Sequence, residues 1–237
     1  MVSEKEVLVL IPAFNEQDRI GEVIAGVRQT LPDVTILVVN DGSTDQTAQV
    51  SLRSGAIVLT HPFNLGVGGA LQTGYKFSVQ RGFKYVIQLD GDGQHPTKYL
   101  TSFLSRLNET EADLIIGSRF LAGYRTSGSF LRRMGNATFA KILSFLIREK
   151  LTDPTSGYRA LKQTVLRFCV QDIYGFDYPD ADFLLTVHRA GFRIEEIPFE
   201  VQARSGGISQ HAGLAPIYYI IKMCLSIFIV LLRKRNR

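Results

Sequence analysis

The stretch YVIQLDGDGQHP, residues 85–96, joins a short apolar run to two aspartates that a single glycine separates. Its first part, Tyr85–Leu89, has the apolar, β-branched character of a strand that is buried on both faces. The Gly-rich part that follows predicts a turn. The carboxylates of Asp90 and Asp92 suit a hard divalent cation such as Mg²⁺ or Mn²⁺, although an ordinary Asp-Gly turn is the alternative interpretation. The stretch therefore predicts a buried strand that ends at a candidate metal site.

The same pattern of a short apolar run followed by a helical segment repeats along the first half of the chain. Further strands are predicted at Val7–Ile11, Thr35–Val39, Ile57–Thr60 and Leu114–Ile116. Segments whose apolar residues have helical spacing lie between the runs, at Asp18–Thr30, Asp45–Ser54, Val67–Arg81 and Thr97–Leu107. Strands that alternate with helices in this way form parallel sheets with helices on both faces. We therefore predict an α/β domain with a doubly wound, mostly parallel sheet.

Polar residues follow three of the predicted strands at the point where each strand ends. They are the segments Phe14–Glu16, Asn40–Ser43 and Asp90–Gly93. Open α/β sheets bind their ligands at the carboxyl ends of their strands, so we expect these segments to converge on one site. Asp41 is a candidate acceptor of hydrogen bonds from a nucleobase or a ribose. Ser43 or Thr44 is a candidate N-cap of the helix that follows.

The second half of the chain has a different character. Leu131–Ile147 predicts an amphipathic, basic helix, and Ala181–Ala190 predicts a helix before a strand at Ile194–Val201. Leu214–Leu232 is a mostly apolar run with a basic tail after it. Lys222 lies near the middle of this run, and a lysine at that depth opposes insertion across a bilayer. We therefore expect a helix that lies in, or dips into, the inner leaflet, and packing on its own domain is the alternative.

Composition and charge agree with a folded domain that meets a membrane surface. The chain has 237 residues, of which 45% are hydrophobic and 21% charged, and its formal net charge is +5. Basic residues gather beside the two apolar helical segments, which favours an anionic membrane over a nucleic acid. They are Arg132, Arg133, Lys141, Arg148 and Lys150 beside the first, and Arg233, Lys234, Arg235 and Arg237 after the second. The two cysteines, Cys169 and Cys224, predict no disulfide framework and fit a reducing cytoplasm.

Five motifs in a fixed order carry a resemblance to a known family. They are Ile11–Glu16, Asn40–Asp45, Asn64–Gly66, Asp90–Pro96 and Asp153–Arg159. Together they resemble glycosyltransferase family 2, in its polyprenyl-phosphate branch, which is similar to dolichyl-phosphate mannose synthase. The resemblance covers roughly residues 6–210. It implies a GT-A catalytic domain over residues 1–210, with an amphipathic interfacial helix at 131–147, and we expect a membrane-associated helix with a basic tail over residues 211–237.

The resemblance also implies roles for individual residues. The donor nucleoside is expected against Pro12, Phe14, Glu16 and Asp41, and a Mg²⁺ or Mn²⁺ ion among Asp90, Asp92 and Gln94. Arg204 is expected to grip the donor diphosphate, and Arg132 and Asn136 to hold an acceptor phosphate. The implied catalytic set is Asp92, Arg204, Arg132 and Asn136. Three positions depart from the family pattern, because Val67 and Gln210 stand where lysine is frequent and Asn136 replaces a serine.

The implied reaction is the inverting transfer of a hexose from a nucleotide-diphosphate sugar, such as UDP-glucose, to polyprenyl phosphate. We expect the protein at the cytoplasmic face of the cell membrane, in a peripheral or monotopic position, where it serves cell-surface glycan synthesis. A small membrane protein or a second copy of the chain is a further candidate partner. Nucleic acid is not an expected partner.

Two other functions stay open. A family-2 transferase with a sugar hydroxyl as acceptor needs a general base, for which Asp180 and Asp182 are candidates. A phosphate monoester needs none, because it is already largely dianionic at neutral pH. A catalytically silent scaffold subunit is disfavoured because the acidic motifs are intact. A dinucleotide-dependent oxidoreductase is disfavoured because the turn Pro12–Glu16 lacks the Gly-x-Gly-x-x-Gly pattern.

Overall fold

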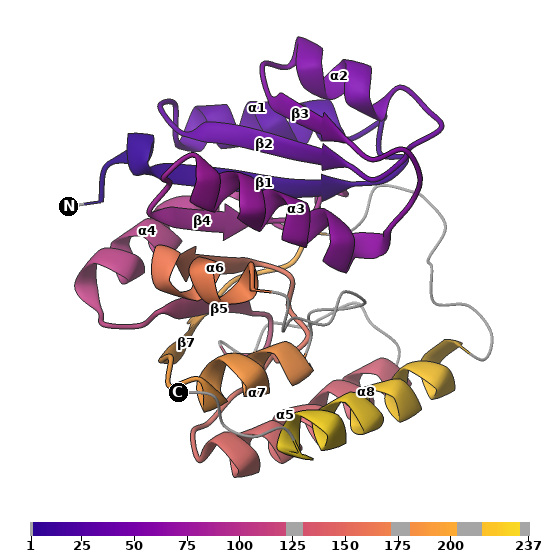
Figure 1. The fold of residues 1–237 in the computed structure, drawn as a ribbon, viewed down its shortest axis with the longest axis vertical. Coiled ribbons are helices and arrows are strands. Elements are labelled where there is room, and N and C mark those ends of the chain that lie inside the picture. Colours follow the sequence, from indigo (N-terminus) through magenta and orange to yellow (C-terminus); the bar gives the residue numbers. More distant parts are fainter. Residues whose placement is uncertain (1, 122–129, 172–180, 203–214, 233–237) are drawn as a thin grey trace.

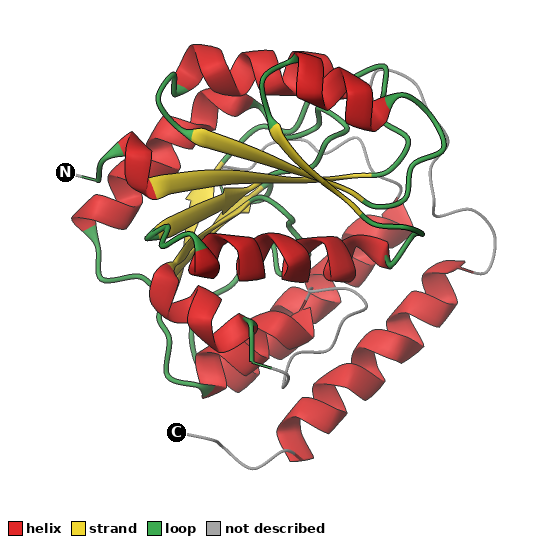
Figure 2. Ribbon diagram, turned by 45° about the horizontal axis from the view of Figure 1, so that its top comes forward, coloured by secondary structure: helices red, strands yellow, loops and turns green. Residues whose placement is uncertain are grey.

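The computed structural model describes residues 2–121, 130–171, 181–202 and 215–232. It shows one sheet with helices on both faces (Figure 1, Figure 2). In the described part of the chain the sheet has seven strands in the order β3-β2-β1-β4-β6-β5-β7. They are β1 Val7–Ala13, β2 Thr35–Asn40, β3 Ile57–Thr60, β4 Tyr85–Gln88, β5 Leu114–Ser118, β6 Arg159–Lys162 and β7 Ile194–Pro198. The predicted α/β class and the doubly wound, mostly parallel sheet are confirmed.

One strand runs against its neighbours. β6 pairs antiparallel with both β4 and β5, whereas the other four strand pairs are parallel. Gln88 at the end of β4 pairs with Arg159 at the start of β6. The loop before β6 therefore reaches the edge at which β1, β2 and β4 end. The sequence pattern did not predict β6, because Arg159 and Lys162 flank only two apolar residues.

Eight α-helices lie within the described residues. They are α1 Ile20–Thr30, α2 Thr47–Arg53, α3 Gly66–Gln80, α4 Leu100–Glu109, α5 Phe130–Ile147, α6 Gln163–Cys169, α7 Ala181–Arg189 and α8 Ala215–Leu232. Single 3₁₀ turns occupy Glu4–Glu6 and Thr97–Tyr99. Seven of these helices agree with the prediction to within a few residues at their ends. The exception is α6, which is too short to show a helical period in the sequence.

Alternate side chains of the central strand enter two hydrophobic cores, one on each face of the sheet. Leu8 and Leu10 of β1 belong to the core that includes residues of α3, α5, α6, α7 and α8. Val7, Val9 and Ile11 belong to the core that includes residues of α1 and α4. This alternation follows from the two-residue period of a strand. All five side chains are fully buried, so β1 carries no polar group until its carboxyl end.

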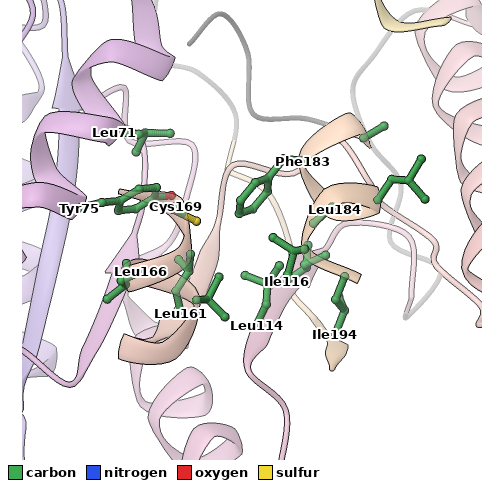
Figure 3. Packing of buried hydrophobic residues seen from close by; sticks show 14 of the residues in the cluster. Leu71, Tyr75, Leu114, Ile116, Leu161, Leu166, Cys169, Phe183, Leu184 and Ile194 are labelled. Carbon is green, nitrogen blue, oxygen red and sulfur yellow. The ribbon is translucent and has the colours of Figure 1, made fainter. Parts of the chain in front are cut away.

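The core beneath α3 joins segments that are far apart in the sequence. Figure 3 shows Leu71 and Tyr75 of α3 beside Cys169 of α6, and Leu184 of α7 near Ile194 of β7. The helices α7 and α8 are in contact, and so are α5 and α7. The C-terminal helices are therefore attached to the first half of the chain through this core.

α8 packs one side on the domain and exposes large apolar side chains on another. Met223, Ile227 and Val230 are buried in the core described above. The exposed apolar side chains of this helix are Leu225, Phe228, Ile229, Leu231 and Leu232. Among the residues that the structure describes, no helix is long and apolar enough to cross a membrane. The membrane association of α8 stays a prediction, and the domain boundary expected at residue 211 lies outside the described residues.

The close approach of α3 to β1 generates a prediction about stability. A Cβ atom added at Gly74 of α3 would lie 2.5 Å from Cδ2 of Leu10, which is fully buried, so the helix or the leucine would have to shift. We expect Gly74→Ala to lower the free energy of unfolding by about 1–3 kcal/mol. In the matched variant Gly21→Ala in α1, the nearest atom is 3.4 Å away, so helix propensity leaves the stability unchanged or raises it by up to about 1 kcal/mol.

Urea unfolding of the two variants measures this difference directly. Equal stability of the two alanine variants would contradict the tight contact between α3 and β1.

Candidate functional site

Hydrogen bonds join the loop after β1 to the loop after β2. The backbone N–H of Asn15 donates to Oγ of Ser43 at 2.9 Å, and the backbone N–H of Thr44 donates to Oδ1 of Asn15 at 2.9 Å. The N–H of Asp41 donates to the carbonyl oxygen of Ala13 at 2.8 Å. Asn15 adopts φ of 55°, a left-handed conformation that asparagine tolerates better than most residues. The loops after β1 and β2 are therefore joined into one hydrogen-bonded surface (the wall) at the carboxyl edge of the sheet.

The prediction that Ser43 or Thr44 caps the N-terminus of α2 is wrong. Ser43 and Thr44 bond to Asn15 and make no capping bond to α2. The N-cap residue is Gln46, which makes no side-chain cap bond, and Oδ1 of Asp45, one residue earlier, accepts the N–H of Thr47 at 2.9 Å. Burial by itself raises the pKa of Asp45, but the hydrogen bonds from Thr47 and from the backbone of Gln17 outweigh it and lower the pKa. Asp45 therefore stays ionised and fastens the start of α2.

The residues expected to hold a nucleoside lie along this wall. Pro12 and Phe14 are partly exposed at the end of β1. Glu16 forms an ion pair with Arg19, at 2.8 Å between Oε2 and Nη1. Asp41 is only 3% exposed and accepts hydrogen bonds from neighbouring segments. The structure thus brings these four residues to one edge of the sheet, and their contact with a nucleoside stays a prediction.

The loop after β4 lies directly against the end of β1. A Cβ atom added at Gly91 would lie 3.4 Å from both the carbonyl oxygen of Pro12 and Cβ of Ala13. The aspartates on either side of Gly91, Asp90 and Asp92 (the acid pair), therefore lie close to the end of β1. The N–H of Gln94 donates to Oδ1 of Asp92 at 3.0 Å, and this bond closes a tight turn around Gly93, whose φ is 76°.

The acid pair offers oxygen ligands to a cation. The side chain of Asp90 is 46% exposed, so its carboxylate is accessible from solvent. Among the described residues no three histidine, cysteine, aspartate or glutamate side chains form a metal-binding group. Two carboxylates with the amide of Gln94 suit Mg²⁺ or Mn²⁺, which complete their coordination with water and phosphate oxygens. The residues present fit such a metal, and their ligand role stays a prediction.

His95 positions the backbone of Asp90. Its Nδ1 accepts the N–H of Asp90 at 3.0 Å, so this nitrogen carries no proton. Burial lowers the pKa of His95 to about 4, with a smaller contribution in the same direction from Arg119 and opposing contributions from the nearby aspartates. The ring stacks on Tyr158, at 4.9 Å between centroids, and meets the edge of Phe199. The only sign of this role in the sequence is a histidine shortly after the acid pair.

The loop before β6 lies on the other side of the acid pair. A Cβ atom added at Gly157 would lie 3.3 Å from Oδ1 of Asp90, so only glycine leaves the carboxylate its full space. The carbonyl oxygen of Gly157 accepts a hydrogen bond of 2.9 Å from Nε2 of Gln88. Gln88 is held in turn by the hydroxyl of Tyr75 in α3. These bonds fix the distance between the loop before β6 and the end of β4.

A buried ion pair anchors the same loop. Asp153 is fully buried, and both of its oxygens accept hydrogen bonds from the guanidinium of Arg119, at 2.6 and 2.7 Å. The backbone N–H of Arg119 donates to the same carboxylate at 3.0 Å. Arg119 follows β5 directly, so this pair ties the loop to the end of a third strand. Asp153 and Arg119 have no distinctive spacing in the sequence, and only the fold reveals the pair.

Asn136 belongs to the polar network around this loop. Its Oδ1 accepts a hydrogen bond of 2.9 Å from Oγ1 of Thr155, whose hydroxyl oxygen also accepts from Arg119 at 2.9 Å. Glu196 of β7 accepts the N–H groups of Thr152 and Asp153. Burial raises the pKa of Glu196, although these hydrogen bonds partly oppose the change. The network connects α5 to the loop that borders Asp90.

Neither of the two expected catalytic arginines has a described side chain. Arg204 lies outside the described residues, and the side chain of Arg132 is not described although α5 itself is. Asp180 also lies outside the described residues. Asp182 is the second residue of α7, and its Oδ1 accepts the N–H of Phe183 at 2.9 Å. Their roles in catalysis stay predictions.

The arrangement of the sheet is similar to that of solved glycosyltransferases. Glucosyl-3-phosphoglycerate synthase from Mycobacterium tuberculosis, in complex with Mn²⁺, UDP-glucose and phosphoglyceric acid, matches with a TM-score of 0.72 and 20% identity. The match covers 94% of this chain and 79% of that one. The sheet, with polar loops and the aspartates Asp90 and Asp92 at its carboxyl edge, therefore has the GT-A fold.

The chain belongs to glycosyl transferase family 2, whose family model matches residues 8–169. Undecaprenyl-phosphate mannosyltransferase from Micrococcus luteus is 31% identical over 222 residues, which are 87% of this chain and 88% of that protein. Dolichyl-phosphate hexose transferase from Haloferax volcanii is 30% identical over 225 residues, which are 93% and 94% of the two chains. The resemblance to the polyprenyl-phosphate branch of the family is thereby confirmed.

The buried ion pair generates a prediction about the loop before β6. In Asp153→Asn the guanidinium of Arg119 loses the charge of a fully buried carboxylate, while asparagine keeps the volume of the side chain. We expect the free energy of unfolding to fall by about 3 kcal/mol or more. The matched variant Glu111→Gln removes a charge from a pair with Arg193 whose side chains are 83% and 68% exposed, so its stability should hardly change.

Thermal and urea unfolding of both variants provide the measurement. If Asp153→Asn were as stable as Glu111→Gln, the ion pair with Arg119 would have no structural role.

Proposed function

We propose that this chain transfers a hexose from a nucleotide-diphosphate sugar to polyprenyl phosphate, with inversion at the anomeric carbon. The observation that carries the proposal is the position of Asp90 and Asp92, between the end of β1 and the loop before β6. Open α/β sheets bind their ligands at this edge, where the strands end. Relatives named for undecaprenyl-phosphate mannosyl transfer and dolichyl-phosphate hexose transfer support the acceptor class.

The donor half of the reaction depends on charge. Departure of a nucleoside diphosphate places negative charge on its oxygens, and fixed positive charge stabilises that change. A divalent cation bound by Asp90 and Asp92, with Gln94 beside them, would supply that charge. His95 and Gly157 keep Asp90 in place through its backbone and its side chain. Arg204 is the proposed second cation for the diphosphate.

The acceptor half needs orientation more than proton transfer. A phosphate monoester is largely dianionic at neutral pH, so it attacks without a general base. We assign its binding to Arg132 and Asn136 of α5. The hydrogen bond from Thr155 to Asn136 supports this assignment, because it connects α5 to the loop beside Asp90. A sugar hydroxyl acceptor is the weaker candidate, since the carboxylate of Asp182 already bonds to the backbone of α7.

The donor sugar is proposed more narrowly as a UDP-hexose, with UDP-glucose the first to test. A structural neighbour holds UDP-glucose with Mn²⁺, whereas one relative is named for mannose and another for hexose. Either Mg²⁺ or Mn²⁺ fits the oxygen ligands of the acid pair.

The proposed place of action is the cytoplasmic face of the membrane, in a peripheral or monotopic position. Phe145 of α5 is 83% exposed, and Lys141, Arg148 and Lys150 lie near it in the sequence and are exposed. Exposed apolar side chains with basic neighbours are typical of a helix at an anionic interface. We include α8 in the same membrane-facing surface, because it also exposes large apolar side chains.

The metal role predicts the effect of one carboxylate. Asp92→Asn keeps the shape of the side chain but removes a charged ligand, so we expect transfer to fall by about a hundredfold or more. Asp33→Asn, in the exposed turn before β2, is the matched control and should keep full activity. Radiolabelled UDP-glucose and undecaprenyl phosphate measure the rate, and addition of Mn²⁺ or Mg²⁺ should restore activity lost in EDTA. Full turnover in EDTA would disprove the metal role.

The acceptor role of α5 predicts the effect of one arginine. A hydrogen bond between charged groups contributes a few kcal/mol, so Arg132→Ala should slow transfer to undecaprenyl phosphate by about ten- to a hundredfold at matched donor occupancy. Hydrolysis of the donor by water should change much less, because it needs no acceptor phosphate. Lys76→Ala removes an exposed charge from α3, outside the proposed membrane surface, and serves as the control.

Two outcomes would contradict these assignments. Equal losses of transfer and hydrolysis in Arg132→Ala would place Arg132 in the donor site or in the structure of α5. A wild-type enzyme that ignored polyprenyl phosphate but glycosylated a free sugar would overturn the proposed function.

A further inference from the structure

The carboxylate of Asp41 is held by three segments of the chain. Its Oδ1 accepts a hydrogen bond of 2.7 Å from Nδ1 of His61 and another of 2.9 Å from the backbone N–H of Leu65. His61 directly follows β3, and its own N–H donates to the carbonyl oxygen of Asn40 at 2.9 Å. Leu65 directly precedes α3. The ends of β2 and β3 and the start of α3 therefore fix the orientation of one side chain.

The ring of His61 is fixed as well. It is 9% exposed, and its Nε2 lies 2.9 Å from Oγ1 of Thr73 in α3. A carboxylate oxygen only accepts hydrogen bonds, so the proton must lie on Nδ1 of the histidine. Thr73 thus contacts Nε2 of the ring, while Nδ1–H donates to Asp41. Rotation of the Asp41 carboxylate would break both of its bonds.

The two oxygens of Asp41 are consequently not equivalent. A carboxylate oxygen has about two lone-pair sites, and both sites of Oδ1 are used by His61 and Leu65. No hydrogen bond to Oδ2 is formed within the part of the chain that the structure describes. Asp41 therefore presents a single oxygen as an acceptor to a ligand at the sheet edge.

This geometry distinguishes between nucleobases. Uracil presents one ring N–H, between two carbonyl groups, and one carboxylate oxygen satisfies it. Guanine presents a ring N–H beside an exocyclic amino group, and the pair of donors is satisfied by both oxygens of a carboxylate. With Oδ1 occupied, one guanine donor would be left unpaired in a buried position, which costs binding free energy.

We propose that His61 is a specificity-determining residue that holds Asp41 in a single-acceptor state and thereby selects uridine over guanosine donors. The inference rests on the proposed function in one respect, namely that Asp41 meets the base of the donor nucleotide. It goes beyond that function by naming the base and the residue that sets the preference. His61 acts through Asp41 and is therefore a positioning residue.

Calorimetric titration with UDP and GDP in saturating Mn²⁺ tests the proposal. The two ligands share ribose, diphosphate and metal, so the ratio of their Kd values reports the base alone. We expect the wild-type protein to bind UDP about ten- to a hundredfold more tightly than GDP. In His61→Ala the affinity for UDP should fall and the preference should shrink to about threefold or less, because one of the two hydrogen bonds to Oδ1 is lost and Oδ1 can accept from the ligand.

Two further variants keep the test decisive if His61→Ala folds poorly. His61→Asn retains an N–H donor near the position of Nδ1 and should recover most of the preference. Thr73→Val removes the support of the ring at nearly constant volume and should reduce the preference part of the way. Equal affinity for UDP and GDP in the wild type, tighter binding of GDP, or an unchanged ratio in the His61 and Thr73 variants would overturn the proposal. Equal affinity is also the outcome if Asp41 contacts only the ribose.

The binding measurement separates this inference from the proposed function. Selective UDP binding without any transfer to undecaprenyl phosphate would support the role of His61 and contradict the proposed acceptor. Transfer from a GDP-hexose at the rate of a UDP-hexose would contradict the role of His61 and leave the proposed reaction intact.

Discussion

The complete burial of the central parallel strands is the constraint on which the site depends. β1 carries fully buried apolar side chains on both faces from Val7 to Ile11, and polar groups placed there would lack partners. The first positions open to a ligand are therefore the loops beyond the strands. Since β1, β2 and β4 are parallel, these loops meet at one edge. The antiparallel β6 adds the loop that ends at Gly157, which a parallel strand in the same place would have carried to the opposite edge.

Hydrogen bonds between loops convert this meeting point into a rigid site. Asn15 bonds to the loop after β2, and Asp90 is confined by His95 on its backbone and by Gly157 on its side chain. The ion pair of Asp153 and Arg119 fixes the loop before β6, and Thr155 extends that network to α5. A site held from several strands loses little free energy of binding to the ordering of its own residues. The proposed donor and acceptor parts of the site thus belong to one connected framework.

The sequence predicted the parts of this framework that have a period or a motif. The five predicted strands of the first half and their helices follow from apolar runs long enough to show alternation, and the acid pair follows from its place after such a run. β6 and α6 are too short, and β6 is too polar, to give that signal. Arg119 and Glu196 meet the loop before β6 only through pairing of β5 with its neighbours. The partnership of His61 with Asp41 likewise arises from the pairing of β2 with β3. Long-range contacts of this kind have no local pattern, and the cap expected at Ser43 failed because Asn15, far away in sequence, captures its hydroxyl.

The position of the donor is tested most directly by a crystal structure of the chain with Mn²⁺ and UDP, with data collected at the manganese absorption edge. We expect an anomalous difference peak in contact with a carboxylate of Asp90 or Asp92 and with the diphosphate, while the nucleoside lies against Asp41. A manganese peak away from both aspartates, or a nucleotide bound elsewhere on the chain, would contradict a donor site at the carboxyl edge of the sheet.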